Sequence, residues 1–115
     1  MTLLYRDDRF LLHQTGSHPE CPERLRAIHA RLEHSGLLQR CTQQAVMSAA
    51  DEDILRVHPE HHLDRIREFA DAGGGRIEVD TVMSPESANV AILAAGAAVD
   101  AVSKVVSGMD STALC

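Results

Sequence analysis

The chain has few aromatic residues, with two Phe, one Tyr and no Trp among its 115 residues. Aromatic side chains supply much of the apolar area of most cores, so this core has to be aliphatic and rich in alanine. A hydrophobic content of 44% and a charged content of 24% are ordinary for a globular domain. The composition predicts a single domain over residues 1–115, with a modest core.

Cysteine is also scarce, and Cys21, Cys41 and Cys115 are scattered along the chain. Their number is odd and no C-x-x-C pair occurs, so no disulfide framework is indicated. The first ten residues have neither the basic nor the apolar segment of a secretory signal. This pattern is typical of a reducing compartment, and we expect a cytoplasmic protein.

Positively charged residues are outnumbered: the chain has 11 Lys and Arg against 17 Asp and Glu, which gives a net charge of −6. Without a basic cluster, no nucleic-acid partner is expected. The longest run of apolar residues and glycine, residues 90–99, is shorter than the roughly 20 residues of a membrane span, so no membrane partner is expected. The sequence contains no P-loop and no G-x-G-x-x-G or G-x-S-x-G motif.

The loop of residues 13–21 separates the N-terminal segment from the first predicted helix. Pro19 and Pro22 keep the residues before them out of the helical conformation, and Pro22 suits the first position of a helix. Helical spacing of apolar residues then predicts a helix that ends at Gly36. The stripe that this helix is expected to bury is Leu25, Ile28 and Leu32.

Shorter segments complete the expected fold. Strands are predicted at Met1–Tyr5 and Thr112–Cys115, and a weak edge strand at Cys41–Val46. Residues 51–72 are expected to form helix in two pieces, divided near Pro59 and ended by the glycines from Gly73.

The longest predicted helix begins after Ser84, a favoured cap, and Pro85, a favoured first residue, and it runs to Ser107. Gly108 is expected to end it. Small side chains let another backbone approach closely, which gives Gly96 a packing role. The predicted inner stripe is Ala88, Ala91, Ile92, Ala95, Val99, Val102 and Val106.

Three histidines, His58, His61 and His62, stand close together in the sequence. His58 and His61 have the spacing for one helix face, but HPEHH is not an H-E-x-x-H motif and a pair needs further ligands. We therefore expect no metal site, but a packed His58 and two surface histidines.

Arg24 lies about 70° from the centre of the predicted helix stripe, whereas Arg26 lies about 130° away and points to water. Two interpretations of Arg24 stay open on this geometry. Either its side chain extends past the core to a surface carboxylate, or its guanidinium is buried and functional.

Three segments together resemble the histone-deacetylase-like family, which includes acetoin-utilisation proteins, acetylpolyamine amidohydrolases and class II histone deacetylases. HPECPERL, with His13 and Gly16 upstream, is similar to the family's HPExPERL. DILRVHPEHHL is similar to the family's L..VH...Y helix, with His62 in place of the Tyr. VDTVMSPES followed by ANVAILAAG is similar to a third family segment.

The resemblance implies an α/β fold: the N-terminal portion of an arginase/deacetylase-like three-layer domain, mostly helical with two or three short strands. Family members are zinc-dependent amidohydrolases that cleave the acetyl amide of a lysine or polyamine. Their zinc ligands and His-His pair belong to segments that this chain does not contain. We therefore expect no catalytic residue, metal ligand or cofactor in the chain, zinc in the complete domain, and no activity of the chain alone.

The resemblance also assigns roles to individual residues. Arg24 matches an arginine that lines the internal channel for released acetate, which favours a buried, hydrogen-bonded guanidinium. Asp80 matches an aspartate on a rim loop that holds the substrate backbone, although a plain turn residue before Thr81 stays an alternative. His18, in the loop Gly16–Cys21 at the active-site mouth, is expected to bind substrate.

Two functions are open as hypotheses. The first is the N-terminal part of a zinc-dependent deacetylase domain, and the alternative is a stand-alone, non-catalytic helical module that binds a partner. An uncovered strand edge or helix face is rare in monomers, so we expect a homo-oligomer built on the Ala/Val face of residues 86–107 or on strand pairing. The missing C-terminal part of the domain is the other expected partner.

Overall fold

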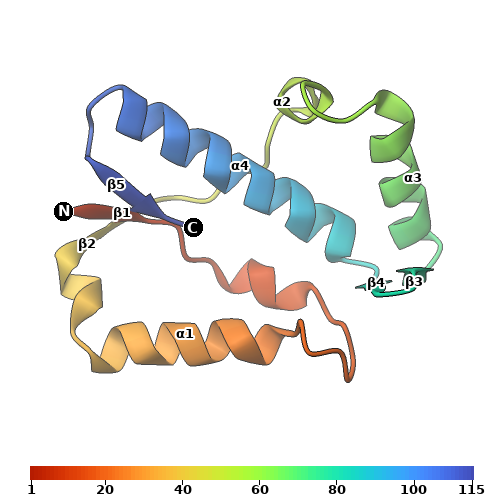
Figure 1. The fold of residues 1–115 in the computed structure, drawn as a ribbon, viewed down its shortest axis with the longest axis horizontal. Helices are drawn as coiled ribbons and strands as arrows, with labels where there is room; N and C mark the ends of the chain where they lie inside the picture. The colour runs from red at the N-terminus through yellow and green to blue at the C-terminus, as the bar shows by residue number, and fades with distance from the viewer.

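The computed structural model describes residues 1–115, which form short strands and helices (Figure 1). The strands are β1 (Thr2–Leu4), β2 (Cys41–Gln43), β3 (Gly75–Glu78), β4 (Thr81–Met83) and β5 (Thr112–Leu114). The α-helices are α1 (Pro22–His34), α2 (Asp51–Leu55), α3 (Glu60–Asp71) and α4 (Ser87–Val106). Two 3₁₀ helices, η1 (Asp8–Leu12) and η2 (Leu37–Arg40), lie before α1 and β2.

Three strands form a parallel sheet in the order β2-β1-β5, while β3 and β4 form a separate antiparallel hairpin. The predicted strands near both ends of the chain and the predicted edge strand are confirmed, although β2 is shorter than expected. The central strand β1 and the residue after it bury Leu3, Leu4 and Tyr5. A strand with neighbours on both sides and a helix across it is expected to be this apolar. The hairpin adds two strands that the sequence pattern does not predict.

The main core lies between β1 and α4. It consists of six buried residues, Leu3, Tyr5, Val46, Leu93, Ala97 and Ala101. Beside them the backbone of residues 47–49 lies against α4, where the Ala49 N–H donates to the Ile92 carbonyl at 3.0 Å. A Cβ atom on Gly96 would overlap the Met47 carbonyl oxygen. The packing role predicted for Gly96 is therefore confirmed.

The rotation of α4 about its axis differs from the prediction. Its buried residues are Ser87, Ala88, Leu93, Gly96, Ala97 and Ala101. The predicted inner residues Val102 and Val106 are instead 63% and 81% exposed. Because α4 is apolar on nearly every side, periodicity alone cannot select the side that packs. The backbone approach at Gly96 selects it.

A polar cluster lies on the C-terminal half of α4. Asp100 accepts hydrogen bonds from the Tyr5 hydroxyl at 2.7 Å and from Lys104 Nζ at 2.6 Å. By length and composition alone α4 could cross a membrane, a test that the core helix of a soluble protein also passes. Since its buried side packs on β1, we describe α4 as the core helix of this fold.

A second, smaller core joins the β3–β4 hairpin to the helices. It contains Ala70 of α3, Met83 of β4 and Ala88 of α4, with Ile66, Phe69 and Ile77 packed against them. Gly74 permits the hairpin to begin, because its φ of 72° favours glycine and a Cβ there would meet the backbone of Met83 and Ser84. This core fixes the position of the β3–β4 hairpin, whose turn carries Asp80.

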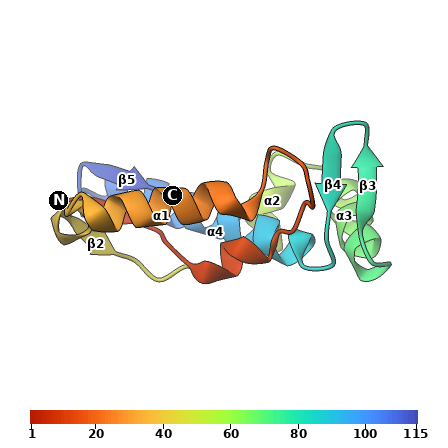
Figure 2. The same ribbon diagram turned by 90° about the horizontal axis from the view of Figure 1, so that it is seen from below.

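The predicted burial of Arg24 is wrong in this structure, and the phase of α1 differs from the expected one. Pro22 and His29 are buried, Ile28 is 49% exposed, and Arg24 is exposed like Arg26. The physical reason is that α1 packs mainly on η1 and η2, so most of its circumference is uncovered. Figure 2 shows the molecule edge-on as a slab, 19 Å across its shortest axis.

Gly96→Ala is expected to destabilise the protein, although the same change in an open helix stabilises by about 1 kcal/mol. The added methyl group overlaps the backbone of residues 47–49, and overpacking of this kind costs ~1–3 kcal/mol. Urea unfolding measures the change. The exposed Ala94→Gly on the same helix is the matched control, with a loss of about 1 kcal/mol from helix propensity alone. A Gly96→Ala protein as stable as the parent would contradict the packing described.

The raised pKa of Tyr5 makes the stability of the protein depend on pH in the alkaline range. Burial, and then the hydrogen bond to Asp100, raise the pKa of Tyr5 from 10.0 to about 12. Because the pKa is higher in the folded state, the protonated Tyr5 hydroxyl contributes to the unfolding free energy. This contribution is fully present below pH 10.0 and is lost as the pH rises through about 12. Between these values we expect the unfolding free energy of the parent to fall more steeply with pH than that of Tyr5→Phe. Equal slopes in denaturant titrations across this range would show that the hydroxyl is not coupled to folding.

Candidate functional site

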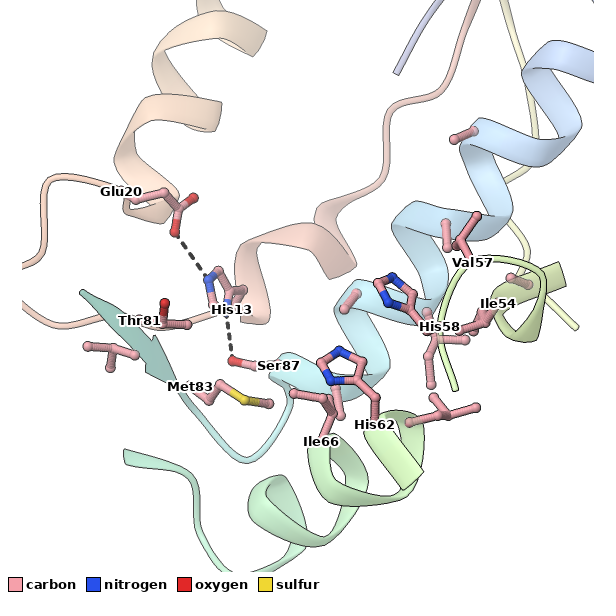
Figure 3. A pocket seen from close by; sticks show the side chains of 18 of the residues that line it. His13, Glu20, Ile54, Val57, His58, His62, Ile66, Thr81, Met83 and Ser87 are labelled. Carbon is pink, nitrogen blue, oxygen red and sulfur yellow. Dashed lines mark hydrogen bonds and ion pairs between the residues drawn. The ribbon is translucent and has the colours of Figure 1, made fainter. Parts of the chain in front are cut away.

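A pocket of about 770 Å³ lies between α4, the α2–α3 segment and the loop before α1 (Figure 3). Its long walls are apolar: α4 contributes Ala91, Ala95 and Val99, and the facing segment contributes Ile54 and Val57. The size is that of a small-molecule site, which is usually apolar with a few placed polar groups. No Lys or Arg lines the pocket, whereas three carboxylates do, so its ionised groups are acidic.

The mouth of the pocket is closed on one side by a contact between two predicted site residues. His18 Nε2 lies 2.8 Å from Asp80 Oδ1, and the Glu20 N–H donates to His18 Nδ1 at 3.0 Å. Because Nδ1 accepts, the neutral ring carries its proton on Nε2 and donates it to Asp80. The side chain of Asp80 is 91% exposed, against 20% for His18. The aspartate is therefore free to exchange this partner for another donor.

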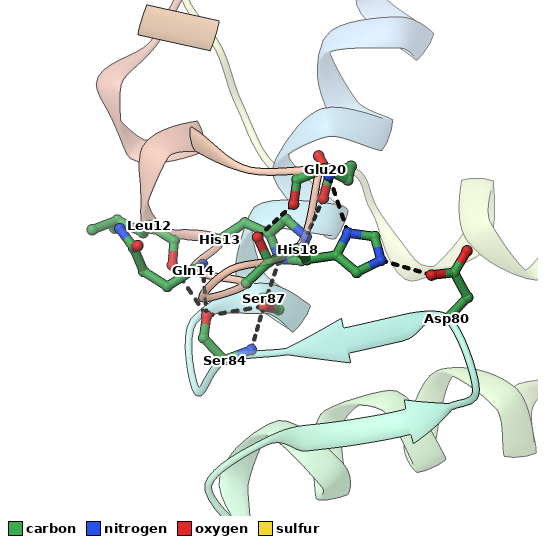
Figure 4. A network of polar contacts seen from close by, with 9 residues as sticks. Leu12, His13, Gln14, His18, Glu20, Asp80, Ser84 and Ser87 are labelled. Carbon is green, nitrogen blue, oxygen red and sulfur yellow. Dashed lines mark hydrogen bonds and ion pairs between the residues drawn. The ribbon is translucent and has the colours of Figure 1, made fainter. Parts of the chain in front are cut away.

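A second histidine anchors the loop to α4 (Figure 4). His13 Nδ1 lies 2.7 Å from Ser87 Oγ, and His13 Nε2 lies 3.1 Å from Glu20 Oε2. A carboxylate only accepts, so Nε2 donates to Glu20 and Nδ1 accepts the Ser87 hydroxyl proton. Ser87 is only 4% exposed at the first turn of α4, so this bond holds the loop at a buried point.

Ser84 supports the anchor from the turn before α4. Its N–H donates to Ser87 Oγ at 2.7 Å, and its hydroxyl donates to the Leu12 carbonyl at 3.1 Å. The Gln14 N–H in turn donates to Ser84 Oγ at 3.2 Å. These bonds hold together residues some 70 positions apart in the sequence. Ser84 was predicted to cap the helix, but it binds the loop, and α4 begins at Ser87.

The order hydroxyl, imidazole, carboxylate in Ser87, His13 and Glu20 is also that of a nucleophile with its base and orienting acid. Here the Ser87 oxygen is buried and already accepts the Ser84 N–H. We therefore assign these residues to positioning the loop. Sequence reasoning assigned no role to Ser87 or Glu20, although Glu20 lies in HPECPERL and Ser87 ends VDTVMSPES, two of the segments that carry the family resemblance.

The histidine cluster differs from its prediction. His58 is exposed and precedes α3, while His62 is half-buried, and their rings stack with centroids 4.9 Å apart. His61 is exposed and does not line the pocket. A helix break between His58 and His61 removes the shared face that their spacing suggested. Figure 3 shows His58 and His62 on the side of the pocket across from His13.

Not all predicted site residues gather here. His18 and Asp80 meet at the mouth, but Arg24 lies outside the pocket on the open side of α1. No group of three or more His, Cys, Asp or Glu side chains is arranged to hold a metal ion. The residues present therefore do not fit zinc, which needs at least three protein ligands.

Comparison with known proteins identifies what this arrangement is similar to. The family described as Histone deacetylase domain matches residues 18–115. The chain is 42% identical over 91 residues to a histone deacetylase-like amidohydrolase of Pseudomonas aeruginosa. The aligned region covers 79% of this chain and 24% of that protein. It is 41% identical over 87 residues to a probable deacetylase of Methanothermobacter thermautotrophicus, and that aligned region covers 76% of this chain and 26% of the relative.

A solved structure shares the fold as well as the sequence pattern. The crystal structure of the HDA15 HD domain superposes with a TM-score of 0.91 at 30% identity, over 97% of this chain and 34% of that one. The expected α/β deacetylase fold is confirmed by this match. The chain spans about a quarter to a third of the length of these similar proteins.

Ser87→Ala is expected to lower the unfolding free energy by ~1–3 kcal/mol, because it leaves the half-buried Ser84 N–H without its acceptor and removes the partner of His13 Nδ1. Urea unfolding provides the measurement. Ser103→Ala on the same helix is the matched control, since its exposed hydroxyl bonds only the Val99 carbonyl, and its change is expected within about 0.5 kcal/mol. Equal effects of the two changes would argue against the anchor.

Proposed function

The chain belongs to the histone deacetylase domain family, and we propose that it forms the N-terminal part of a zinc-dependent deacetylase domain. In this proposal the loop of residues 13–21 and the turn at Asp80 form one side of the substrate entrance. The observation that carries the proposal is the His18–Asp80 contact at the mouth of the apolar pocket. It joins two residues that family resemblance alone placed at a substrate rim.

Asp80 suits the binding of a substrate backbone. Its carboxylate is almost fully exposed, and its single side-chain partner is a neutral donor that a substrate N–H can replace. Charge-assisted hydrogen bonds of this kind are roughly twice as strong as neutral ones. His18 then orients the carboxylate in the free protein and keeps its own geometry through the Glu20 N–H.

The charge around the pocket supports a cationic substrate. Glu20, Asp53 and Asp80 line it, and neither Lys nor Arg does. Carboxylates raise the local concentration of cations and disfavour anions. An acyl-lysine side chain in a basic peptide or an acylated polyamine fits such a site, with its aliphatic part against the apolar walls.

The residues of this chain do not fit a zinc ion, because no three of its His, Cys, Asp or Glu side chains are grouped to hold one. The proposal assigns its ligands to the remainder of the domain. What these residues do is bind and orient a substrate at the entrance. Arg24, exposed on α1, contributes to an acetate channel only when another layer of the domain covers that side of the helix.

A second candidate is a stand-alone, non-catalytic interaction module. Its support is the set of exposed valines on α4 and the exposed strand β5, which offer an apolar face and a free strand edge to a partner. This candidate needs no zinc and no substrate.

The two candidates differ in what happens when the chain replaces its counterpart in a relative. We expect the purified chain with added zinc to hydrolyse neither acetyl-lysine peptides nor acetylpolyamines. A chimera, in which the part of this chain that matches the Pseudomonas aeruginosa amidohydrolase over 91 residues replaces the corresponding region of that protein, is expected to regain zinc-dependent hydrolysis. A folded chimera without activity would favour the interaction module.

Asp80→Asn in the chimera tests the substrate entrance. Loss of a charge-assisted hydrogen bond to substrate is expected to raise KM roughly tenfold, with a smaller effect on kcat. Asp64→Asn is the matched control, because Asp64 is an exposed carboxylate of α3 that does not line the pocket. A kcat loss without a KM change would show that Asp80 does not bind the substrate.

A further inference from the structure

A series of four polar contacts joins the Leu12 carbonyl to the Glu20 carboxylate (Figure 4). The Ser84 hydroxyl lies 3.1 Å from the Leu12 carbonyl oxygen, and Ser84 Oγ lies 2.9 Å from Ser87 Oγ. Ser87 Oγ lies 2.7 Å from His13 Nδ1, and His13 Nε2 lies 3.1 Å from Glu20 Oε2. A carbonyl and a carboxylate only accept, so all the protons must come from the three groups between them.

A neutral His13 ring brings too few protons for these contacts. Each serine hydroxyl brings one proton and the neutral ring brings one, so three protons are shared among four contacts. When Nδ1 of the neutral ring takes the Ser87 proton, no proton lies between the two serine oxygens.

A second proton on the ring completes the series. Nδ1–H then donates to Ser87 Oγ, the Ser87 hydroxyl turns to Ser84 Oγ, and the Ser84 hydroxyl keeps its bond to the Leu12 carbonyl. Ser87 Oγ also accepts the Ser84 N–H, so it accepts twice and donates once, which is the full capacity of a hydroxyl. The positions of these atoms therefore fit the doubly protonated ring better than the neutral one.

The charges around His13 act on its second proton in both directions. The N-terminal end of α4 disfavours a positive charge near Ser87, because the helix dipole is positive there. The Glu20 carboxylate, in direct contact with the ring, opposes this effect. The other titratable groups that line the pocket are His18, Asp53, His58, His62 and Asp80, with no Lys or Arg among them. The charged residues of the adjoining segments are Asp8 and Arg9 of η1, where Arg9 pairs with Asp7, and Glu86 before α4.

Glu20 connects this proton to the substrate entrance. Its carboxylate contacts His13, its N–H donates to His18 Nδ1 at 3.0 Å, and its carbonyl accepts the Thr15 hydroxyl. His18 in turn donates to Asp80 at 2.8 Å. Three groups of one residue thus fix the loop, and only the contact with His13 changes in strength with the charge of that ring.

We propose that His13 is a positioning residue of the substrate entrance and acts in its doubly protonated form, as a proton-dependent anchor of the loop of residues 13–21. The role at the entrance rests on the proposed function. Proton uptake at Nδ1 adds a hydrogen bond between the two serine oxygens and makes the contact with Glu20 an ion pair. Both gains are present at low pH and are lost as the pH rises and the ring loses its proton. Histidine changes charge between about pH 5 and 8, so the anchor is strongest at the acidic end of this range.

NMR of the isotope-labelled chain tests the proposal without any activity, because it reports the protons on the His13 ring and the state of the loop. Ser84→Ala removes the acceptor of the Ser87 hydroxyl, which favours the neutral ring. We expect His13 in this variant to lose its proton roughly one pH unit lower than in the parent, the equivalent of one hydrogen bond. In the parent, the amide signals of His18 and Glu20 are expected to change over the same pH range as the ring.

Glu20→Gln tests the ion pair at an exposed position, since the amide still accepts from Nε2–H but carries no charge. It is also expected to lower the pH of proton loss by roughly one unit. Glu68→Gln is the matched control, because Glu68 is an exposed carboxylate of α3 that does not line the pocket, and its His13 is expected to behave like that of the parent.

Two results would overturn the proposal: proton loss from His13 at the same pH in the parent and in the folded variants, or loop amide signals that do not follow the ring. If Ser84→Ala does not fold, Glu20→Gln and the parent decide. The expected NMR result together with a folded but inactive chimera would refute the proposed function alone.

Discussion

The contact of α4 with the backbone of residues 47–49 determines most of this structure. Gly96 permits it, because any side chain there would occupy the position of the Met47 carbonyl oxygen. The contact sets the rotation of α4, and the rotation turns Leu93, Ala97 and Ala101 toward β1. It also decides which side of the helix is left apolar and uncovered.

The same rotation positions the candidate site. With α4 held in this way, Ser87 is buried at its N-terminal end and bonds His13 from the loop before α1. The loop then presents His18 to Asp80, which the β3–β4 hairpin holds in place. A series of hydrogen bonds thus connects the core helix to the exposed Asp80 carboxylate at the pocket mouth. A shift of the helix would therefore change the position of this carboxylate.

The uncovered surfaces have a common physical cause. α1 is uncovered over most of its circumference, and α4 packs on β1 but is open toward the pocket. Arg24, exposed here, and the exposed valines of α4 lie on surfaces that nothing in this chain covers. The HDA15 HD domain that the chain resembles is longer, and the match covers 34% of it.

The sequence by itself determined the local elements and the family. Strand and helix positions depend on periodicity, on proline at the start of α1 and on glycine at its end, because these effects act over a few neighbouring residues. The motif HPECPERL and two further segments identified the deacetylase fold that the comparisons confirm. Only the tertiary structure decided which faces pack. The apolar pattern of α4 allows several rotations, and the choice comes from a backbone distant in sequence. The His13–Ser87 anchor and the β3–β4 hairpin likewise depend on contacts between segments, which no local pattern specifies, and the exposure of Arg24 depends on the layers that are present to cover it.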